Sequence, residues 1–264
     1  MEGPVADLHV HTTASDGELT VPEVPAVARQ AGVECVAITD HDRIHPELDA
    51  PVTRLDGVRI VRGIELRVDA GPVNVDLLGF AVERTDRLAA TVRRIQRDRV
   101  RRGREIIDHA EAYLDVDLPI EATEGIGRPH IARAIAESDA DYGYQGAFDH
   151  LIGSGCPCYV PREIPTFERG RELLGEACAV VALAHPFRYR RVDRALDLLD
   201  DLDAVERYYP YGWDVDVGRI EREIRRRGLL AVGGSDAHDP VLGKAGLPRE
   251  DYRRFLEALP EAEA

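Results

Sequence analysis

The first apolar segment of the chain, residues 5–12, reads VADLHVHT. Side chains alternate between the two faces of a β-strand, so Asp7, His9 and His11 project from one face. The apolar residues between them point to the other face, where they pack into a core. The segment therefore predicts a buried strand whose His-x-His end can chelate a metal ion.

Histidine and carboxylate residues recur at the ends of other apolar segments. Residues 229–232 predict another buried strand, after which Asp236 and His238 again lie two positions apart. The remaining candidate donors are Asp16, Asp40, His41, Asp42, Glu65 and His185. If the strands form one sheet, these donors face one pocket, which is the pattern of a multinuclear metallohydrolase site.

Strand-like and helix-like segments alternate along most of the chain, which indicates an α/β protein with a largely parallel sheet. The expected strands span residues 5–11, 34–39, 58–65, 73–80, 179–184, 202–208 and 229–232, and the expected helices span 21–30, 192–199 and 215–227. Residues 85–167 are charged and helix-like, without a convincing strand. We therefore expect a catalytic barrel over residues 1–84 and 168–264, interrupted by a helical insertion over residues 85–167. The candidate donors then fall at the strand ends, where barrels carry catalytic groups.

The composition is strongly acidic, with a formal net charge of -15 and Lys244 as the only lysine. Such a surface suits high salt, which screens self-repulsion, so we expect a halophilic host; the alternative is an ordinary acidic protein from a GC-rich genome. No apolar run reaches the roughly 20 residues that span a bilayer, and the first residues lack the features of a signal peptide. These observations predict a cytoplasmic protein without a membrane segment, and no feature indicates an obligate protein partner.

The four cysteines are Cys35, Cys156, Cys158 and Cys178. They lack the paired Cys-x-x-Cys spacing of a structural zinc site. We expect thiols in a reducing compartment rather than metal ligands or a disulfide.

An arginine-rich segment lies at residues 92–114. Such a run could bind phosphate groups or RNA. Asp98 and Glu105 are interleaved with the arginines, and arginine favours helices. We therefore expect a helix whose arginines face solvent.

Several motifs along the chain occur in the order typical of one enzyme family. They are Asp7-Leu8-His9-Val10-His11-Thr12, Ser15-Asp16-Gly17, Ile38-Thr39-Asp40-His41-Asp42, Gly63-Ile64-Glu65, Gly127-Arg128-Pro129-His130-Ile131-Ala132, Ala184-His185-Pro186 with Arg188-Tyr189, and Gly234-Ser235-Asp236-Ala237-His238. Through this ordered set the chain resembles the PHP (polymerase and histidinol phosphatase) family. Within that family it is similar to the 3',5'-nucleoside bisphosphate phosphatases and the related 5'-3' exoribonucleases. The resemblance covers nearly the whole chain and implies a distorted (βα)7 barrel of PHP type with a helical insertion.

The resemblance also implies a site for three divalent metal ions, for which manganese is expected and iron or zinc are the alternatives. It places His9, His11, Glu65 and Asp236 on one ion, Glu65, His185 and Asp76 on a second, and Asp16, His41 and His238 on the third. Asp76 departs from the family pattern, in which a histidine often precedes the Leu-Leu-Gly stretch, and its carboxylate either favours a hard cation or weakens the second site. The implied catalytic residues are His9, His11, Glu65, Asp236 and His238. Asp7, Asp40 and Asp42 are expected to orient ligands or cap loops rather than to bind metal.

Arg128 and His130 lie at the expected start of a helix, where backbone N–H groups and a guanidinium can meet an anion. Arg188 could supply a second, bidentate contact. The alternative is that these arginines pair with surface carboxylates. The resemblance favours a substrate phosphate as their partner.

The implied activity is that of a metal-dependent phosphoesterase, in which a metal-activated water attacks phosphorus. The expected partners are a small phosphorylated substrate, namely a 3',5'-nucleoside bisphosphate, and short RNA shortened from its 5' end. The chain has no Gly-x-Ser-x-Gly elbow and no Walker-type loop, which argues against a serine nucleophile or a nucleotide P-loop. The alternatives are a histidinol-phosphatase-like enzyme and a non-catalytic metal-binding PHP module.

Overall fold

The computed structural model describes residues 3–262 and divides the chain into two compact units. The first unit comprises the residues up to Ala90 and those from Ile164 onward, and the second is Thr91–Glu163. Helix α2 (Asp86–Leu114) begins in the first unit and continues into the second. Within residues 3–262, no helix combines the length and the apolar character that crossing a bilayer requires.

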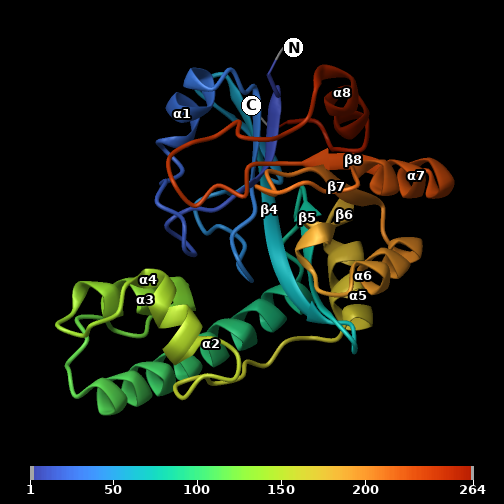
Figure 1. Cartoon of the computed structure of the whole chain (residues 1–264). Coiled ribbons are helices and arrows are strands. Elements are labelled where there is room, and N and C mark those ends of the chain that lie inside the picture. The colour runs from blue at the N-terminus through green and yellow to red at the C-terminus, as the bar shows by residue number, and fades with distance from the viewer. Residues whose placement is uncertain (1–2, 263–264) are drawn as a thin grey trace. The chain divides into compact units, whose positions relative to one another are not determined.

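The first unit is built on one curved sheet (Figure 1). Its strands are β1 (Ala6–Val10), β2 (Cys35–Ile38), β3 (Val52–Leu55), β4 (Val58–Asp69), β5 (Asn74–Phe80), β6 (Val180–Leu183), β7 (Ala204–Tyr208) and β8 (Leu230–Gly233). Their order is β1-β2-β4-β5-β6-β7-β8, and β3 pairs with β4 outside this path. A parallel bridge between Val10 and Ala237 brings the β1 edge beside the segment that follows β8. The sheet therefore curls into a half-barrel, as the expected barrel fold requires.

The centre of the sheet is antiparallel, and in this respect the expectation of a largely parallel sheet is wrong. β4 pairs antiparallel with β5, and β5 pairs antiparallel with β6, whereas β1-β2-β4 and β6-β7-β8 run parallel. The reason is local, because only four residues separate β4 from β5. A parallel pairing needs a crossover of a dozen or more residues.

β3 was not expected either, although the sequence contains a signal for it. Asp56 and Gly57 join β3 to β4, and both have positive φ, at 47° and 83°. Asp-Gly between two apolar segments is a typical two-residue hairpin turn, because glycine and aspartate tolerate this left-handed conformation. The turn makes β3 an antiparallel neighbour of β4.

The helices of the first unit lie beside this sheet. They are α1 (Val24–Gln30), α5 (Phe167–Ala177), α6 (Val192–Asp197), α7 (Val217–Arg227) and α8 (Arg249–Glu257), with short 3₁₀ helices η2 (Pro186–Arg188) and η3 (Leu198–Asp201). α7 ends at Gly228, whose left-handed φ of 68° suits a helix C-cap. α5 and α8 were not expected from the sequence. α8 covers the core through Phe255, whose ring meets that of Phe80 edge-on at 5.3 Å.

The second unit is helical and has its own apolar core. It contains most of α2, together with α3 (Arg128–Glu137), α4 (Tyr144–Ala147) and the π-helical turn η1 (Phe148–Ile152). Ile106, Ile131 and Leu151 belong to one buried cluster that draws on these helices. The unit lies within the segment 85–167 in which the sequence predicts a helical insertion.

Removing the Phe255 ring should destabilise the first unit. Phe255 and Phe80 are both fully buried, so Phe255→Ala leaves a cavity and is expected to lower the free energy of unfolding by about 3–5 kcal/mol. Urea unfolding measures this change. Arg253→Ala, at an exposed position of the same helix, is the control and should change stability by less than about 0.5 kcal/mol. Equal effects of the two substitutions would contradict this account of the core.

Candidate metal centre

The predicted donors come from strands of the first unit, most of them at or just after the carboxyl end of a strand. His9 lies in β1 and His11 follows it, His41 follows β2, Glu65 lies in β4, His185 follows β6, and Asp236 and His238 follow β8. Asp16 reaches the same place from a tight turn after β1, in which the Gly17 N–H donates to the Thr12 carbonyl at 3.0 Å. The structure therefore brings these residues into one centre at the end of the sheet where such barrels carry their catalytic groups.

Two clusters of donors share His9. In one, the Nε2 atoms of His9 and His11 lie 3.5 and 3.1 Å from Asp236 Oδ1. In the other, the Nε2 atoms of His9 and His185 lie 3.5 and 3.1 Å from Glu65 Oε1. In each cluster the ligand atoms lie within 4.8 Å of one another, so each can surround a cation.

A third cluster joins Asp16, His41 and His238 to His11. Asp16 Oδ1 lies 3.7 Å from His41 Nε2 and 3.5 Å from His238 Nε2. The ring of His11 lies 4.4 and 4.2 Å, between centroids, from the rings of His41 and His238. Glu65 Oε2 lies 2.6 Å from His41 Nδ1, so the three clusters adjoin one another.

Several donor atoms have no hydrogen-bond partner within the described part of the protein and are suited to binding metal ions. His9 Nε2, both ring nitrogens of His11, and Asp16 Oδ1 are buried and make no hydrogen bond with other described residues (3–262). Buried polar atoms are normally paired, so unpaired ones require an explanation such as an ion. Imidazole and carboxylate ligands without thiolate suit Mn, Fe or Zn divalent ions.

Glu206, a buried carboxylate in β7, supports two of the donors and was missed from the sequence. Its Oε1 lies 3.1 Å from His9 Nδ1, and its Oε2 accepts a hydrogen bond of 2.7 Å from the backbone N–H of His185. With Nδ1 donating to Glu206, the His9 ring presents Nε2 to the clusters, which is how carboxylates orient metal-binding histidines. The available signal was a lone charge after Ala204-Val205 inside a buried strand.

Asp7 and Asp40 bind loops around the centre, in agreement with their expected role. Asp7 accepts hydrogen bonds from the N–H and the hydroxyl of Ser235, at 2.8 and 2.6 Å, and from the Gly243 N–H at 2.9 Å. Asp40 accepts from the N–H and the hydroxyl of Thr12, both at 2.8 Å, and from the Ser15 hydroxyl at 2.6 Å. Both carboxylates are buried and hold the segments from which ligands project.

The backbone of the centre is strained. Asp42, His185 and Asp236 have φ angles of 51°, 26° and 49°, and they are three of the six non-glycine residues with positive φ among residues 3–262. Such conformations cost of the order of 1–3 kcal/mol each and persist where the surroundings enforce them. Gly234 is packed so closely that a Cβ there would lie 2.2 Å from the His9 N atom. The surrounding fold therefore imposes the positions of the donors.

Mutual electrostatics set the charge of the donors. Burial alone would raise the pKa of Asp236, but His9 and His11 lower that pKa well below its usual value. Burial likewise opposes ionisation of Glu65, yet His41 and His9 hold its pKa well below normal. Burial would lower the pKa of His9, but Glu206, Asp236 and Glu65 together raise that pKa well above normal. The centre is therefore rich in anionic ligands and holds a proton on His9 when no metal is bound.

Asp76 and Arg188 occupy different places at the edge of the centre. Asp76 is buried, and its Oδ2 lies 2.5 Å from Arg67 Nη1 but 3.8 Å from His185 Nε2. It is outside the three clusters formed by the described residues. Arg188 is half-exposed, and its Nη1 donates to Asp236 Oδ2 at 3.1 Å, so this guanidinium adjoins the clusters directly.

Arg128 and His130 lie in the second unit, at the N-terminus of α3. His130 Nδ1 accepts the Gly127 N–H at 3.1 Å, which caps the helix. The Arg128 guanidinium lies 5.7 Å from the centroid of the Phe148 ring. Their binding of a substrate phosphate stays a prediction.

Two arginines of α2 are buried, contrary to the expectation that the arginine run faces solvent. Arg99 and Arg102 are only 6% and 8% exposed, and their Nε atoms donate to the carbonyls of Ile126 and Val160. Burial, with Arg128 and Arg162 nearby, lowers the pKa of Arg102 to about 10. The second unit thus concentrates positive charge beside the start of α3, and the sequence pattern alone could not separate these arginines from the exposed ones.

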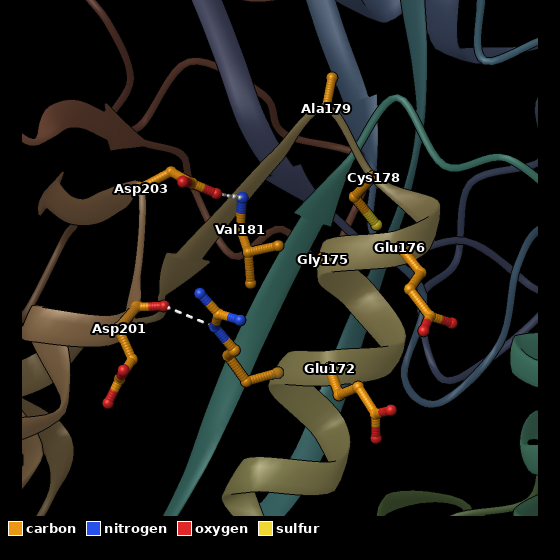
Figure 2. A pocket seen from close by; sticks show the side chains of 9 residues that line it. Glu172, Gly175, Glu176, Cys178, Ala179, Val181, Asp201 and Asp203 are labelled. Atoms are coloured by element: carbon orange, nitrogen blue, oxygen red, sulfur yellow. Dashed lines mark hydrogen bonds between the residues drawn. The ribbon is translucent and has the colours of Figure 1, made fainter.

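Figure 2 shows a surface pocket beside α5 and β6. Its charged lining is engaged in hydrogen bonds of the fold itself. Asp203 Oδ2 accepts the Val181 N–H at 2.9 Å, and Arg171 Nε donates to the Asp201 carbonyl at 2.9 Å. None of the metal-donor residues lines this pocket.

A family model described as the PHP domain matches residues 7–142, which include the His-x-His strand, Asp16, His41 and Glu65. The chain belongs to the PHP family. The family and the barrel-like α/β fold expected from the sequence are thereby confirmed.

Three bacterial relatives of this PHP protein are similar over most of its length. The 3',5'-nucleoside bisphosphate phosphatase of Chromobacterium violaceum is 28% identical, over 90% of this chain and 88% of that protein. The phosphoribosyl 1,2-cyclic phosphate 1,2-diphosphodiesterase of Eggerthella lenta is 29% identical, over 94% of this chain and 98% of that protein. The 5'-3' exoribonuclease Rnm of Escherichia coli is 26% identical, over 89% of this chain and 86% of that protein.

A solved structure has the same fold over nearly the whole PHP chain. It is that of a proposed metal-dependent phosphoesterase from Bifidobacterium adolescentis, with a TM-score of 0.81 and 25% identity, covering 98% of this chain and 99% of that chain. Together with the relatives, it supports the expected activity of a metal-dependent hydrolase of phosphoric esters.

Neutralising Glu206 should weaken metal binding by the PHP centre. Glu206→Gln keeps the shape of the side chain but removes the charge that orients His9, so the affinity for a divalent metal is expected to fall about 10- to 100-fold. Competition with a chelating dye measures this affinity. Glu257→Gln, an exposed position of α8, is the control and should bind metal normally. Unchanged affinity in a folded Glu206→Gln protein would refute the orienting role.

Metal binding should release protons above the ordinary imidazole pKa of about 6.5. Because the pKa of His9 is raised in the metal-free protein, His9 remains protonated above that pH, and a metal must displace the proton from Nε2. The number of protons released should then diminish as the pH rises through the raised pKa of His9. Calorimetric titration in buffers of different ionisation enthalpy measures the number of protons, and a heat independent of the buffer at pH 7.5 would contradict the assignment.

Proposed function

We propose that this chain hydrolyses a phosphate monoester of a small nucleotide, in particular a 3',5'-nucleoside bisphosphate, and removes nucleotides from the 5' end of short RNA. The observation that carries the proposal is the adjoining set of three donor clusters, with the half-exposed guanidinium of Arg188 at its edge. Multinuclear centres of this kind suit phosphoryl transfer because cations can stabilise both the attacking and the leaving oxygen. The names of the Chromobacterium and Escherichia relatives support a nucleotide or RNA substrate.

The proposed ligand set regroups the donors of the three clusters so that Glu65 serves two ions. His9, His11, Glu65 and Asp236 serve one ion, Glu65 and His185 a second, and Asp16, His41 and His238 a third. Asp76 is a weaker candidate for the second ion, because Arg67 already binds its carboxylate. Manganese is the metal that we favour, since the donors are oxygen and imidazole only, with iron or zinc as alternatives.

The protein residues position the substrate and manage its charge. When bound, the metal ions would supply Lewis acidity toward the phosphoryl oxygens and acidify a water molecule. Arg188 is placed to hold a phosphoryl oxygen beside Asp236, and a planar guanidinium suits that geometry. Arg128 and His130 are proposed to hold the phosphate that is not cleaved, and the positive charge around Arg102 favours an anion in the second unit. With both phosphates held, the scissile one would be oriented for attack.

Two other classes of substrate are alternatives to the nucleotide, and both are included in the phosphate-release assay below. The relative from Eggerthella, similar over 98% of its length, is named for hydrolysis of a cyclic phosphate, so a cyclic phosphodiester is the second candidate substrate. Histidinol phosphate represents the other phosphatase class. A non-catalytic metal-binding module is disfavoured, because the predicted donors in the three clusters are all present and close together.

We further propose a halophilic, cytoplasmic setting. The net charge of -15 and the near absence of lysine support it, since carboxylates retain water and cations at high salt. Assays of phosphate release at low and high KCl test the halophilic setting.

The proposal is tested by phosphate release from metal-loaded protein. The substrates are adenosine 3',5'-bisphosphate, AMP, a short 5'-phosphorylated RNA, a ribosyl 1,2-cyclic phosphate and histidinol phosphate. Preferential turnover of the bisphosphate or the RNA is expected, with His9→Ala and Asp236→Ala inactive. Preference for the cyclic phosphate or histidinol phosphate would overturn the nucleotide assignment, and activity in either alanine variant would overturn the ligand assignment.

Arg128→Ala should harm the bisphosphate selectively. Losing a charged contact to the uncleaved phosphate is expected to lower kcat/KM for adenosine 3',5'-bisphosphate about 10- to 100-fold, while AMP hydrolysis changes by less than about threefold. Arg133→Ala, at an exposed position of the same helix, is the matched control. An equal loss for both substrates would show that Arg128 does not hold the second phosphate.

A further inference from the structure

A ladder of aromatic rings extends from the metal centre to the surface of the first unit. It consists of Phe187, Tyr209, Tyr211 and Trp213, and we call it the aromatic ladder. Tyr209 and Tyr211 lie 4.7 Å apart between ring centroids, and Tyr211 meets Trp213 edge-on at 5.8 Å. Phe187 supports Tyr211 from the side at 5.5 Å.

The inner end of the aromatic ladder is attached to the donor clusters. The Tyr209 ring lies edge-on to His185 at 5.4 Å, and its hydroxyl donates to Asp236 Oδ2 at 2.8 Å. Arg188 donates to the same hydroxyl at 2.9 Å, and its guanidinium lies 6.0 Å from the Tyr209 ring centroid. The ladder therefore begins where the proposed phosphate contact lies.

The outer end of the aromatic ladder is an exposed tryptophan. Trp213 is 58% exposed, whereas Tyr211 beneath it is buried. Gly212 between them has a φ of 73°, a left-handed conformation that glycine adopts without strain. The turn at Gly212 directs the chain so that a large apolar ring stays in contact with solvent, although burial would be favourable.

We propose that the exposed end of the aromatic ladder, Trp213 on Tyr211, stacks the nucleobase of the substrate and so makes the enzyme select nucleotides over base-free phosphoesters. This inference rests on the proposed nucleotide function and assigns its base subsite. A nucleotide carries its base one ribose away from its phosphate, and the ladder joins a phosphate-binding end to an exposed aromatic face. Stacking on an aromatic ring accepts every base, which suits both mononucleotides and RNA ends.

The chain contains a single tryptophan, so its fluorescence reports on this position directly. Metal-loaded protein is titrated with AMP and, separately, with ribose 5-phosphate, which has the same phosphate without the base. Saturable quenching by AMP and none by ribose 5-phosphate is expected. No quenching by AMP, or equal quenching by both compounds, would overturn the inference.

Substitution of Trp213 supplies a kinetic test. The ratio of kcat/KM for adenosine 3',5'-bisphosphate to kcat/KM for ribose 5-phosphate should fall about tenfold in Trp213→Ala and be largely restored in Trp213→Phe, which can still stack. Tyr113→Ala is the matched control, since Tyr113 is also 58% exposed, and its ratio should equal that of the unaltered protein. An unchanged ratio in Trp213→Ala, with the bisphosphate still hydrolysed, would refute the base subsite alone. Turnover of ribose 5-phosphate without any nucleotide turnover would refute the proposed function and, with it, this inference.

Discussion

Imidazole and carboxylate groups crowd together in a buried centre at one end of the curled sheet, and this crowding constrains the rest of the structure. His9 Nε2, both ring nitrogens of His11 and Asp16 Oδ1 are buried without hydrogen-bond partners in the described chain. Such burial is unfavourable unless a cation compensates it. The mutual shifts in the pKa values of Glu65 and Asp236 show how strongly these groups already interact without an ion. A set of anionic ligands held ready for divalent cations accounts for these observations together.

A second layer of buried carboxylates keeps the donors in place. Glu206 joins His9 of β1 to the backbone of His185 after β6, while Asp7 joins β1 to the segment after β8. Asp40 performs the same task for the turn after β1. These contacts connect strands that are distant in sequence, and they give a reason for the strained backbone at His185 and Asp236, since neighbouring segments on several sides determine those positions.

Local patterns in the sequence predicted much of the fold and most of the centre. Period-two alternation at Asp7, His9 and His11 identified the first strand and its ligand face, and the motif order identified the family. The antiparallel pairing of β5 escaped prediction, because strand direction depends on the length of a connection rather than on the strand itself. Arg99 and Arg102 were misjudged for a related reason, since helical periodicity does not say which arginines another segment will cover.

By itself, the sequence determined which residue types were available to bind metal and which short segments would carry them, because alternation and turn chemistry act over a few residues. Only the tertiary structure decided that Glu206 supports His9, that Asp76 is engaged by Arg67, and that the rings from Tyr209 to Trp213 lead outward from Asp236. These relations join β1 to β7, β4 to β5, and the segment after β7 to the segment after β8. Arg67 and Asp76 lie opposite each other because β4 and β5 pair antiparallel. The other two pairings arise when the sheet curls and brings strand ends together, and no local pattern along the chain encodes the distance between two such ends.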